Sequence, residues 1–423
     1  MPTSRAPWAA LALALAATYC TPSTERTDGT SAAVDAAVRV DGDYDAAVRV
    51  DGDYDAAVRV DGDYADVVSP TDVGVDEDAT SGPLEPDAGS IAELDARSVP
   101  TLDGSQDPGD AGPSGDSAAD AGVSCRTRDT DAPPRAASFP ARLAGQDAWI
   151  HDERSAAGYF HTYDALTLGP DTRKIHVFLP RSYPAGCQRY PVLYMHDGDA
   201  VFFPGPVGKT WDVQRLLEQA YAAQQIREVI VVAVHPLERE REYTHVPWLP
   251  GHACCGLPTY TDYLADVLKA FVDGAYRTDS GPQQTIIAGS SHGGLAAFYA
   301  ATVRGDVFGR AIAMSSSLWV GLDSITVGGP LSTSALMQAS APGLAARPRL
   351  YLDWGLIRTG GTHNSLIEAR ATARGREMAG LLQQSYGYVP GVDLLTVEDP
   401  QGEHDEDSWR RRLGPALQFI LRP

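Results

Sequence analysis

Apolar residues beyond residue 135 fall into two alternating patterns. Short apolar runs predict strands at residues 174–179, 190–195, 228–234, 285–288, 308–314, 349–352 and 392–397. Longer segments with amphipathic or helix-forming patterns predict helices at residues 211–225, 260–276, 295–303, 364–386 and 408–421. The run at 228–234 is so uniformly branched that both faces of its strand must be covered. Strands that alternate with helices predict an α/β fold, with a mainly parallel sheet between two helical layers.

Residues 21–134 have a different composition from this body. They contain 27 acidic residues, 7 arginines and no lysine, and so carry −20 of the formal net charge of −22. Residues 35–64 repeat one decapeptide three times without change. Its Asp-Gly-Asp resembles part of a calcium loop, but the full ligand pattern and closing Glu are absent. The segment lacks the apolar surface to offset chain entropy, so we expect a disordered acidic linker and a globular domain at 135–423. Nucleic acid and anionic lipid are poor partners for such a linker.

The first 20 residues have the features of an export signal. Arg5 precedes ten apolar residues at 8–17, a run too short to span a bilayer. Residues 17–20 resemble a bacterial lipobox ending at Cys20, although Tyr19 replaces the expected small residue. We therefore expect a periplasmic or cell-surface lipoprotein anchored at Cys20, or a secreted protein if the lipobox fails.

Four further cysteines, Cys125, Cys187, Cys254 and Cys255, permit disulfides in an exported protein. Their pairing stays open at the level of sequence, because four cysteines allow three connectivities. None of their spacings is typical of a metal site.

The pattern Gly-Ser-Ser-His-Gly at 289–293 joins a predicted strand directly to a predicted helix. In this strand–turn–helix context Ser291 is a candidate nucleophile, held in an exposed and strained turn. Gly289 and Gly293 are expected because a Cβ at either position would collide with the neighbouring strand or helix. The amide of His292 is then one candidate oxyanion donor. The alternative is a glycine-rich connection without chemistry.

A serine nucleophile needs a histidine base, and in α/β-hydrolases the chain order is Ser, acid, His. Beyond His292, only His363 and His404 follow Ser291. His404 lies in a loop between the last predicted strand and the last predicted helix, which is the place expected for the base. His363 precedes a long helix and is better explained as a surface or capping residue.

Six segments in one order resemble the esterase D and enterochelin-esterase-like family of α/β-hydrolases. They are residues 191–198, 239–244, 289–294, 314–319, 351–355 and 404–413. The resemblance extends over most of residues 172–421. It implies an α/β-hydrolase fold, with a second oxyanion donor at the amide of Gly198 or Asp199.

The acid is less well defined by this resemblance. Family members often carry it three residues after the glycine that corresponds to Gly355, but this chain has Arg358 there. Asp353 at the strand end is the preferred candidate. The alternatives are a Ser–His dyad without an acid or one of three further carboxylates, namely Glu398, Asp399 and Glu368.

The resemblance implies a serine esterase that hydrolyses a carboxylic ester, such as an acylated sugar or a siderophore, without a metal or organic cofactor. Metal binding by Asp197 and Asp199 is a weaker interpretation, because two carboxylates alone are a poor metal signal. Trp319, Trp354 and Phe203 are candidates for the substrate pocket or, equally, for the core. The alternative function is a non-catalytic surface or binding protein, which the missing family acid favours.

Overall fold

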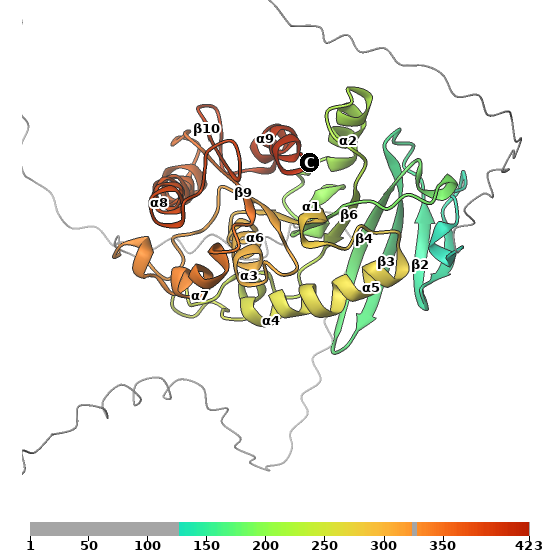
Figure 1. The fold of residues 1–423 in the computed structure, drawn as a ribbon, viewed down its shortest axis with the longest axis horizontal. Coiled ribbons are helices and arrows are strands. Elements are labelled where there is room, and N and C mark those ends of the chain that lie inside the picture. Colours follow the sequence, from blue (N-terminus) through green and yellow to red (C-terminus); the bar gives the residue numbers. More distant parts are fainter. Residues whose placement is uncertain (1–126, 324–327, 423) are drawn as a thin grey trace, which may run out of the picture. The chain divides into compact units, whose positions relative to one another are not determined.

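The structure is a computed structural model that describes residues 127–323 and 328–422. Its core is a ten-stranded sheet with the order β1-β2-β3-β4-β6-β5-β7-β8-β9-β10 (Figure 1). The strands are β1 Phe139–Leu143, β2 Gln146–His151, β3 Gly158–Leu168, β4 Asp171–Pro180, β5 Val192–Met195, β6 Ile230–Val234, β7 Thr285–Ser290, β8 Arg310–Met314, β9 Arg349–Gly355 and β10 Leu394–Asp399.

The sheet has two parts that differ in strand direction. Strands β6, β5, β7, β8, β9 and β10 are parallel, whereas β1 to β4 are antiparallel and β4 joins β6 antiparallel. The predicted parallel sheet is therefore confirmed for its larger part. The outer strands β1, β2 and β3 were not predicted from the sequence.

Helices cover both faces of the parallel part. Leu264, Phe298 and Leu336 belong to the core on one face, and Leu217 and Leu417 to the core on the other. The helices are α1 Gly198–Val201, α2 Val213–Ala222, α3 Arg239–Tyr243, α4 Leu257–Asp262, α5 Lys269–Ala275, α6 His292–Val303, α7 Ala335–Leu344, α8 Ala369–Tyr386 and α9 Glu406–Ile420. The π-helical turns Tyr263–Leu268 and His363–Glu368 lead into α5 and α8, and short 3-10 turns lie at Asp129–Asp131, Tyr183–Ala185, Pro282–Gln284 and Leu331–Thr333.

Strand β6 shows why its sequence is apolar at every position. Ile230, Val232 and Val234 contribute to the core under α4–α8, whereas Val231 and Ala233 contribute to the core under α2 and α9. Side chains alternate between the faces of a strand, so a strand covered on both faces must be apolar throughout. Complete burial of one such aliphatic side chain stabilises the fold by about 1.5–3 kcal/mol.

The ordered body begins before residue 135. The Thr130 hydroxyl donates a hydrogen bond of 2.5 Å to the carbonyl of Ala275, and Asp131 pairs with Arg277. The export signal, Cys20 and the repeats at 35–64 lie outside the described residues. Within residues 127–323 and 328–422, no helix is both long and apolar enough to cross a membrane.

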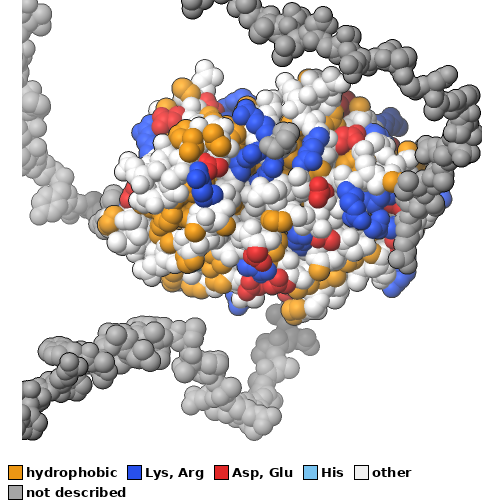
Figure 2. All heavy atoms as spheres, in the orientation of Figure 1, with side chains coloured by type: hydrophobic (Ala, Val, Ile, Leu, Met, Phe, Trp, Pro, Cys, Tyr) orange, Lys and Arg blue, Asp and Glu red, His pale blue; other side chains and the backbone are white. Residues whose placement is uncertain are grey.

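The globular domain has a nearly balanced charge. Residues 135–423 carry 29 acidic and 26 basic side chains. On the face shown in Figure 2, both kinds are interspersed with apolar side chains. This face therefore presents no extended field of a single sign.

Candidate active site

The functional residues meet at the carboxyl edge of the parallel strands. Ser290 at the end of β7 pairs with Met314 at the end of β8, which in turn pairs with Asp353 near the end of β9. The loops that follow these strands therefore begin side by side. Ligands of open α/β sheets bind at this edge, beyond the carboxyl ends of the strands.

Ser291 stands alone between β7 and α6 with a φ of 54° and a ψ of −122°. A non-glycine residue in such a conformation costs on the order of 1–3 kcal/mol, and such strain is typical of functional sites. Gly289 permits the turn, because a Cβ there would lie 2.5 Å from the carbonyl oxygen of Gly293. Gly294 is just as constrained, since its Cβ would lie 2.5 Å from Ser316 Oγ. The predicted strand–turn–helix unit and its strain are confirmed.

The expectation that Ser291 is exposed is wrong, because only 6% of it is accessible. The loop after β8 covers it. The Ser291 amide donates to the Met314 carbonyl (3.0 Å), and the Ser317 amide donates to the Ser291 carbonyl (2.9 Å). The hydroxyl oxygens of Ser291 and Ser317 are 3.5 Å apart. Hydrogen bonds therefore fix both the amide and the carbonyl of the nucleophile.

His404 is oriented by Glu368. Its Nδ1 lies 2.5 Å from Glu368 Oε2, and both side chains are buried. Because an ionised carboxylate only accepts hydrogen bonds, Nδ1 carries the proton and Nε2 is left as the basic nitrogen. The His404 amide also donates to Asn364 Oδ1 (2.9 Å). A base with its proton fixed on the far nitrogen is the arrangement that serine hydrolysis requires.

Glu368 is itself held from two other strand ends. Its Oε1 accepts a hydrogen bond of 3.0 Å from the Ser315 hydroxyl and a second one from the Gly355 amide. The carboxylate thus connects the loop after β8, the end of β9 and the loop that carries His404.

The expectation that Asp353 orients His404 is contradicted by its contacts. Its Oδ2 lies 3.0 Å from Arg412 Nε, and its Oδ1 accepts from Arg412 Nη2 (3.1 Å) and from the Ser315 amide (3.1 Å). Burial raises the pKa of Asp353, while Arg412 acts in the opposite direction. The physical reason is strand alternation: Asp353 shares its face of β9 with Tyr351, which packs in the core beneath α9, the helix that carries Arg412.

Two further carboxylates that could have served as the acid are paired with other groups. Glu398 forms an exposed bidentate pair with Arg376, at 2.7 Å for both contacts. Asp399 accepts from the Gln401 amide (2.9 Å) and lies 3.4 Å from Arg412 Nη1. Among the four candidate carboxylates, Glu368 is the one that contacts the His404 ring.

Arg358 occupies the position expected for the family acid, and its side chain makes structural contacts instead. Its guanidinium donates to the Gly355 carbonyl (3.1 Å) and to the Thr372 hydroxyl (2.6 Å). The arginine therefore ties the loop after β9 to α8 and takes no part in orienting the base.

A signal for Glu368 was present in the sequence. Asn364 and Glu368 are four residues apart on one helical segment, so their side chains share a face. Both contact His404, one at its amide and the other at its ring. A buried polar pair with this spacing, directly after a strand of the sheet, is a recognisable candidate for such a role.

The candidate oxyanion residues lie in two adjacent turns. His292 is the first residue of α6, and Gly198 and Asp199 begin α1. The first amides of a helix have no acceptor within it and so remain able to bind an anion. A Cβ on Gly293 would lie 3.2 Å from Asp197 Oδ2, which shows that the two turns are in contact.

Asp197, which precedes this turn, is engaged in protein contacts. It has a left-handed φ of 54°, forms a bidentate pair with Arg239 (2.8 and 3.1 Å), and its amide donates to Tyr243 Oη (3.0 Å). Gly198 fits closely, because a Cβ there would lie 2.7 Å from the Val234 backbone. These contacts fix the turn in place.

Aromatic rings surround His292. Its ring lies 5.2 Å from that of Trp248 and 6.0 Å from that of Trp319, and its Nδ1 is 3.0 Å from Ser317 Oγ. Burial, aided by the positive charge of Arg239, lowers the pKa of His292 well below its usual range. The imidazole beside the nucleophile is therefore neutral.

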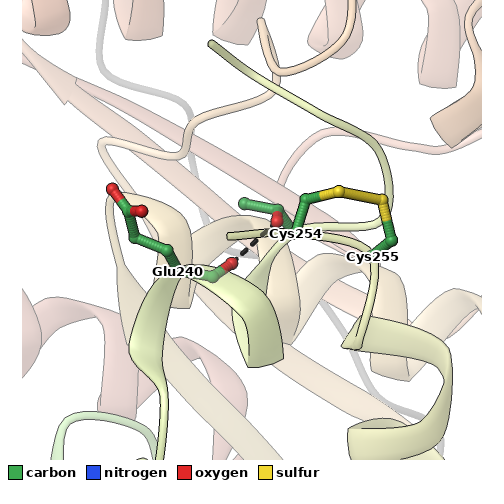
Figure 3. Close-up of a disulfide and its surroundings, with 4 residues drawn as sticks. Glu240, Cys254 and Cys255 are labelled. Carbon is green, nitrogen blue, oxygen red and sulfur yellow. Dashed lines mark hydrogen bonds between the residues drawn. A yellow bond between two sulfur atoms is a disulfide. The ribbon is translucent and has the colours of Figure 1, made fainter. Parts of the chain in front are cut away.

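The loop that carries Trp248 contains a disulfide between the adjacent residues Cys254 and Cys255 (Figure 3). The Cys255 amide donates to the Thr244 carbonyl (3.0 Å), which ties the loop to the end of α3. The sequence alone does not specify this pairing.

The three aromatic pocket candidates have different environments. Trp319 and Trp354 are 1% and 2% exposed and belong to the core. Phe203 is half-buried and lines a surface hollow together with Asp199.

Comparison with known proteins identifies the family. Residues 168–420 match the family model described as "Putative esterase". This chain belongs to that family. Membership, together with the sheet and the elbow, confirms the expected α/β-hydrolase fold and supports hydrolase activity of the esterase type.

The relatives of this esterase are distant. An uncharacterised protein, YbbA of Bacillus subtilis (strain 168), is 27% identical over 157 residues, which are 35% of this chain and 58% of the relative. Similar solved structures include an IroE-like serine hydrolase from Shewanella oneidensis (20% identity, 59% of this chain and 75% of that chain, TM-score 0.44). Another is the enterobactin esterase FES from Shigella flexneri, crystallised in the presence of enterobactin (17% identity, 62% and 58% coverage, TM-score 0.45).

Proposed function

We propose that this protein hydrolyses a carboxylic ester with Ser291 as nucleophile, His404 as base and Glu368 as the acid that orients the base. The observation that carries the proposal is the 2.5 Å contact between His404 and Glu368, at the same sheet edge as the strained Ser291. The case for a non-catalytic binding protein depended on a missing acid, and Glu368 removes that reason for it.

The reaction takes two steps. Ser291 Oγ attacks the ester carbonyl carbon while His404 Nε2 accepts the hydroxyl proton, and the imidazolium that forms is stabilised by Glu368. The amides of His292 and of Gly198 or Asp199 donate to the oxyanion. The C–O bond then breaks, and the alcohol leaves with the proton from His404. Water attacks the acyl-enzyme with His404 again as base, releasing the acid and restoring Ser291.

Labelling with a fluorophosphonate tests this assignment. Mass spectrometry of the full chain should find one adduct, on Ser291, and the variant Ser291→Ala should have no adduct and no esterase activity. His404→Ala should reduce kcat to a similar degree, because residues of such a unit act together. Failure of the folded protein to form the adduct would favour a binding protein without turnover.

The substrate we propose is an acylated sugar or a siderophore-like ester. A panel of 4-nitrophenyl esters of increasing chain length, together with feruloyl and acetylated sugar esters, would define the acyl and alcohol parts. The highest kcat/KM identifies the class, and uniform inactivity across the panel would reject a carboxylic ester.

We further propose export and lipid anchoring at Cys20, on the strength of the signal-like residues 1–20. Radiolabelled fatty acid should be incorporated into the wild type, and Cys20→Ser should release the protein from the membrane fraction. If the wild type incorporates no label, the Tyr19 departure has defeated the lipobox and the protein is secreted.

A further inference from the structure

The antiparallel part of the sheet carries two surface hollows that contain neither Ser291, His404 nor Glu368. Their volumes are about 780 and 800 Å³, and Trp149 and Asp164 line both of them. The two hollows therefore adjoin at Trp149 and Asp164, and together they are here called the β2–β3 trough. Single ligand pockets usually measure about 300–1,000 Å³, so the trough has room for a chain of several units.

Trp149 lies in the middle of this trough. Its neighbours in β2, Ala148 and Ile150, are buried, whereas Trp149 itself is 44% exposed. Strand alternation places it on the outward face, where the core gains nothing from it. The indole therefore remains accessible to a ligand lying in the trough.

Both cations that line the trough are paired with carboxylates, and Asp199 adds one further carboxylate. Lys174 Nζ lies 3.0 Å from Asp164 Oδ1, and Arg142 Nη1 lies 2.8 Å from Asp147 Oδ1. All four of these side chains line the hollows. With its cations already paired, the trough offers little attraction to a phosphate or carboxylate ligand and favours an uncharged one.

Two neutral imidazoles, His176 and His235, line the hollow at the active-site end of the trough. His176 Nδ1 is 2.8 Å from Thr162 Oγ1, while the buried Nε2 of His235 has no hydrogen-bond partner among the described residues. Burial lowers the pKa of His176 to about 3 and that of His235 to about 4. Neutral imidazoles have one donor and one acceptor each, which matches a hydroxyl group rather than an anion.

The inner end of the trough reaches the active-site turn. Asp199 and Phe203 line it, and Asp199 directly follows Gly198, one of the candidate oxyanion residues. A ligand lying on Trp149 would therefore extend toward the position of the ester carbonyl.

We infer that the β2–β3 trough binds the saccharide chain of a glycan ester, with a sugar ring stacked on the indole of Trp149. An uncharged polyhydroxyl chain fits the paired charges and the neutral imidazoles. The C–H face of a sugar ring carries partial positive charge, which the negative face of an indole attracts. This inference deepens the proposed esterase function. Only the claim that the bound glycan carries an ester rests on that function, whereas saccharide binding does not.

Binding is tested in the full-length Ser291→Ala variant, so that hydrolysis plays no part. Xylohexaose, cellohexaose and chitohexaose, all without ester groups, are titrated by calorimetry and by tryptophan fluorescence. At least one should bind, and adding Trp149→Ala should weaken its Kd at least about tenfold, while Trp149→Phe should restore part of the affinity. Val392→Ala, an exposed apolar position at 61% accessibility, is the matched control and should bind like the parent.

A kinetic comparison provides the second readout, in protein that retains Ser291 and is therefore active. Trp149→Ala should raise KM for acetylated xylan or another glycan ester several-fold and leave kcat/KM for 4-nitrophenyl acetate unchanged. Equal effects on both substrates would overturn the inference.

The remaining outcomes separate the trough from the proposed chemistry. If none of the three hexasaccharides binds, the trough is not a glycan site. If sedimentation reveals a dimer that Trp149→Ala dissociates, the trough is an interface between copies, which also overturns the inference. If a hexasaccharide binds through Trp149 but no ester is hydrolysed, the trough stands and the proposed esterase function fails.

Discussion

Strands β5 and β6 bury every side chain, whereas β2 alternates buried residues with accessible ones. The difference follows from what covers them, because helices pack on both faces of the parallel strands and the outward face of β2 carries the trough. In the covered part, polar groups such as Glu368 and Asp353 are locked between layers by several contacts each. In the outer part, the side chain of Trp149 remains accessible to a ligand. We therefore expect chemistry to depend on the first part and substrate binding to depend on the second, while both contribute to stability.

The largest effect on chemistry is expected from Glu368→Gln. The amide can no longer stabilise the imidazolium and favours the wrong tautomer of His404, so kcat should fall by about 10³–10⁴-fold. The melting temperature should stay close to that of the wild type. Glu398→Gln, which changes an exposed carboxylate paired with Arg376, is the control and should be active. An active Glu368→Gln would disprove the assignment of the acid.

Phe160→Ala should do the reverse, with a large effect on stability and a small one on chemistry. Phe160 is fully buried and packs at ring distances of 5.0 Å against both Phe178 and Phe202. Truncation of such a ring costs about 3–5 kcal/mol of unfolding free energy. Urea denaturation measures this loss, and kcat on 4-nitrophenyl acetate should remain within about threefold of wild type, or roughly 0.7 kcal/mol of barrier. A collapse of kcat at unchanged stability would contradict the division between the two parts.

Asp353→Asn should lower stability more than turnover, since Asp353 contacts Arg412 rather than His404. Loss of the carboxylate leaves the buried guanidinium with only the more distant Asp399 as a counter-charge, which costs up to about 3 kcal/mol. We expect kcat to fall less than about tenfold, or 1.4 kcal/mol of barrier. The double variant with Arg412→Leu should regain part of the stability. A kcat as low as that of Glu368→Gln would make Asp353 a member of the catalytic unit.

The smallest expected effect is on pH dependence, through the buried His161 of β3. Burial lowers the pKa of His161 to about 3 in the folded protein, while the unfolded chain titrates near 6.5. Below pH 6.5 the unfolded state binds the additional proton, so this residue's contribution to stability is present above that pH and lost as pH falls. The free energy of unfolding should decrease by about 1.4 kcal/mol per pH unit for this proton. His161→Gln should flatten the profile by one proton between pH 6 and 4, and an unchanged slope would contradict this prediction.

The two parts of the sheet also differed in how well the sequence predicted them. Strands β5, β6 and β7 were found because burial on both faces makes their residues uniformly apolar. In β3, His161 and Thr162 are buried but polar, and their hydrogen bonds to Tyr276 and His176 satisfy them only in the folded sheet. These residues interrupt the apolar pattern, so a strand of eleven residues gave no clear signal.

Local and non-local features also explain which residues of the candidate site were predicted correctly. Ser291 and His404 are marked by local features, a glycine-framed turn and a position in the chain order. The spacing of Asn364 and Glu368 marks Glu368 as one candidate partner of His404, but the choice among four carboxylates depends on side-chain direction across three strand ends, which local sequence does not record. Asp353 lies at the expected strand end but points to the α9 side of the sheet, whereas Glu368 reaches the histidine from the next helix.

The loop after β8 has a consequence for how the site tolerates thermal motion. Its first serine, Ser315, holds Glu368, and its third, Ser317, holds the carbonyl of Ser291. One short segment of three residues thus touches both ends of the proton relay. When the tip of β8 moves, the nucleophile and the acid are carried in the same direction, so their separation fluctuates less than the position of either. The loop after β8 therefore keeps the distance between Ser291 and Glu368 nearly constant, even when both residues shift.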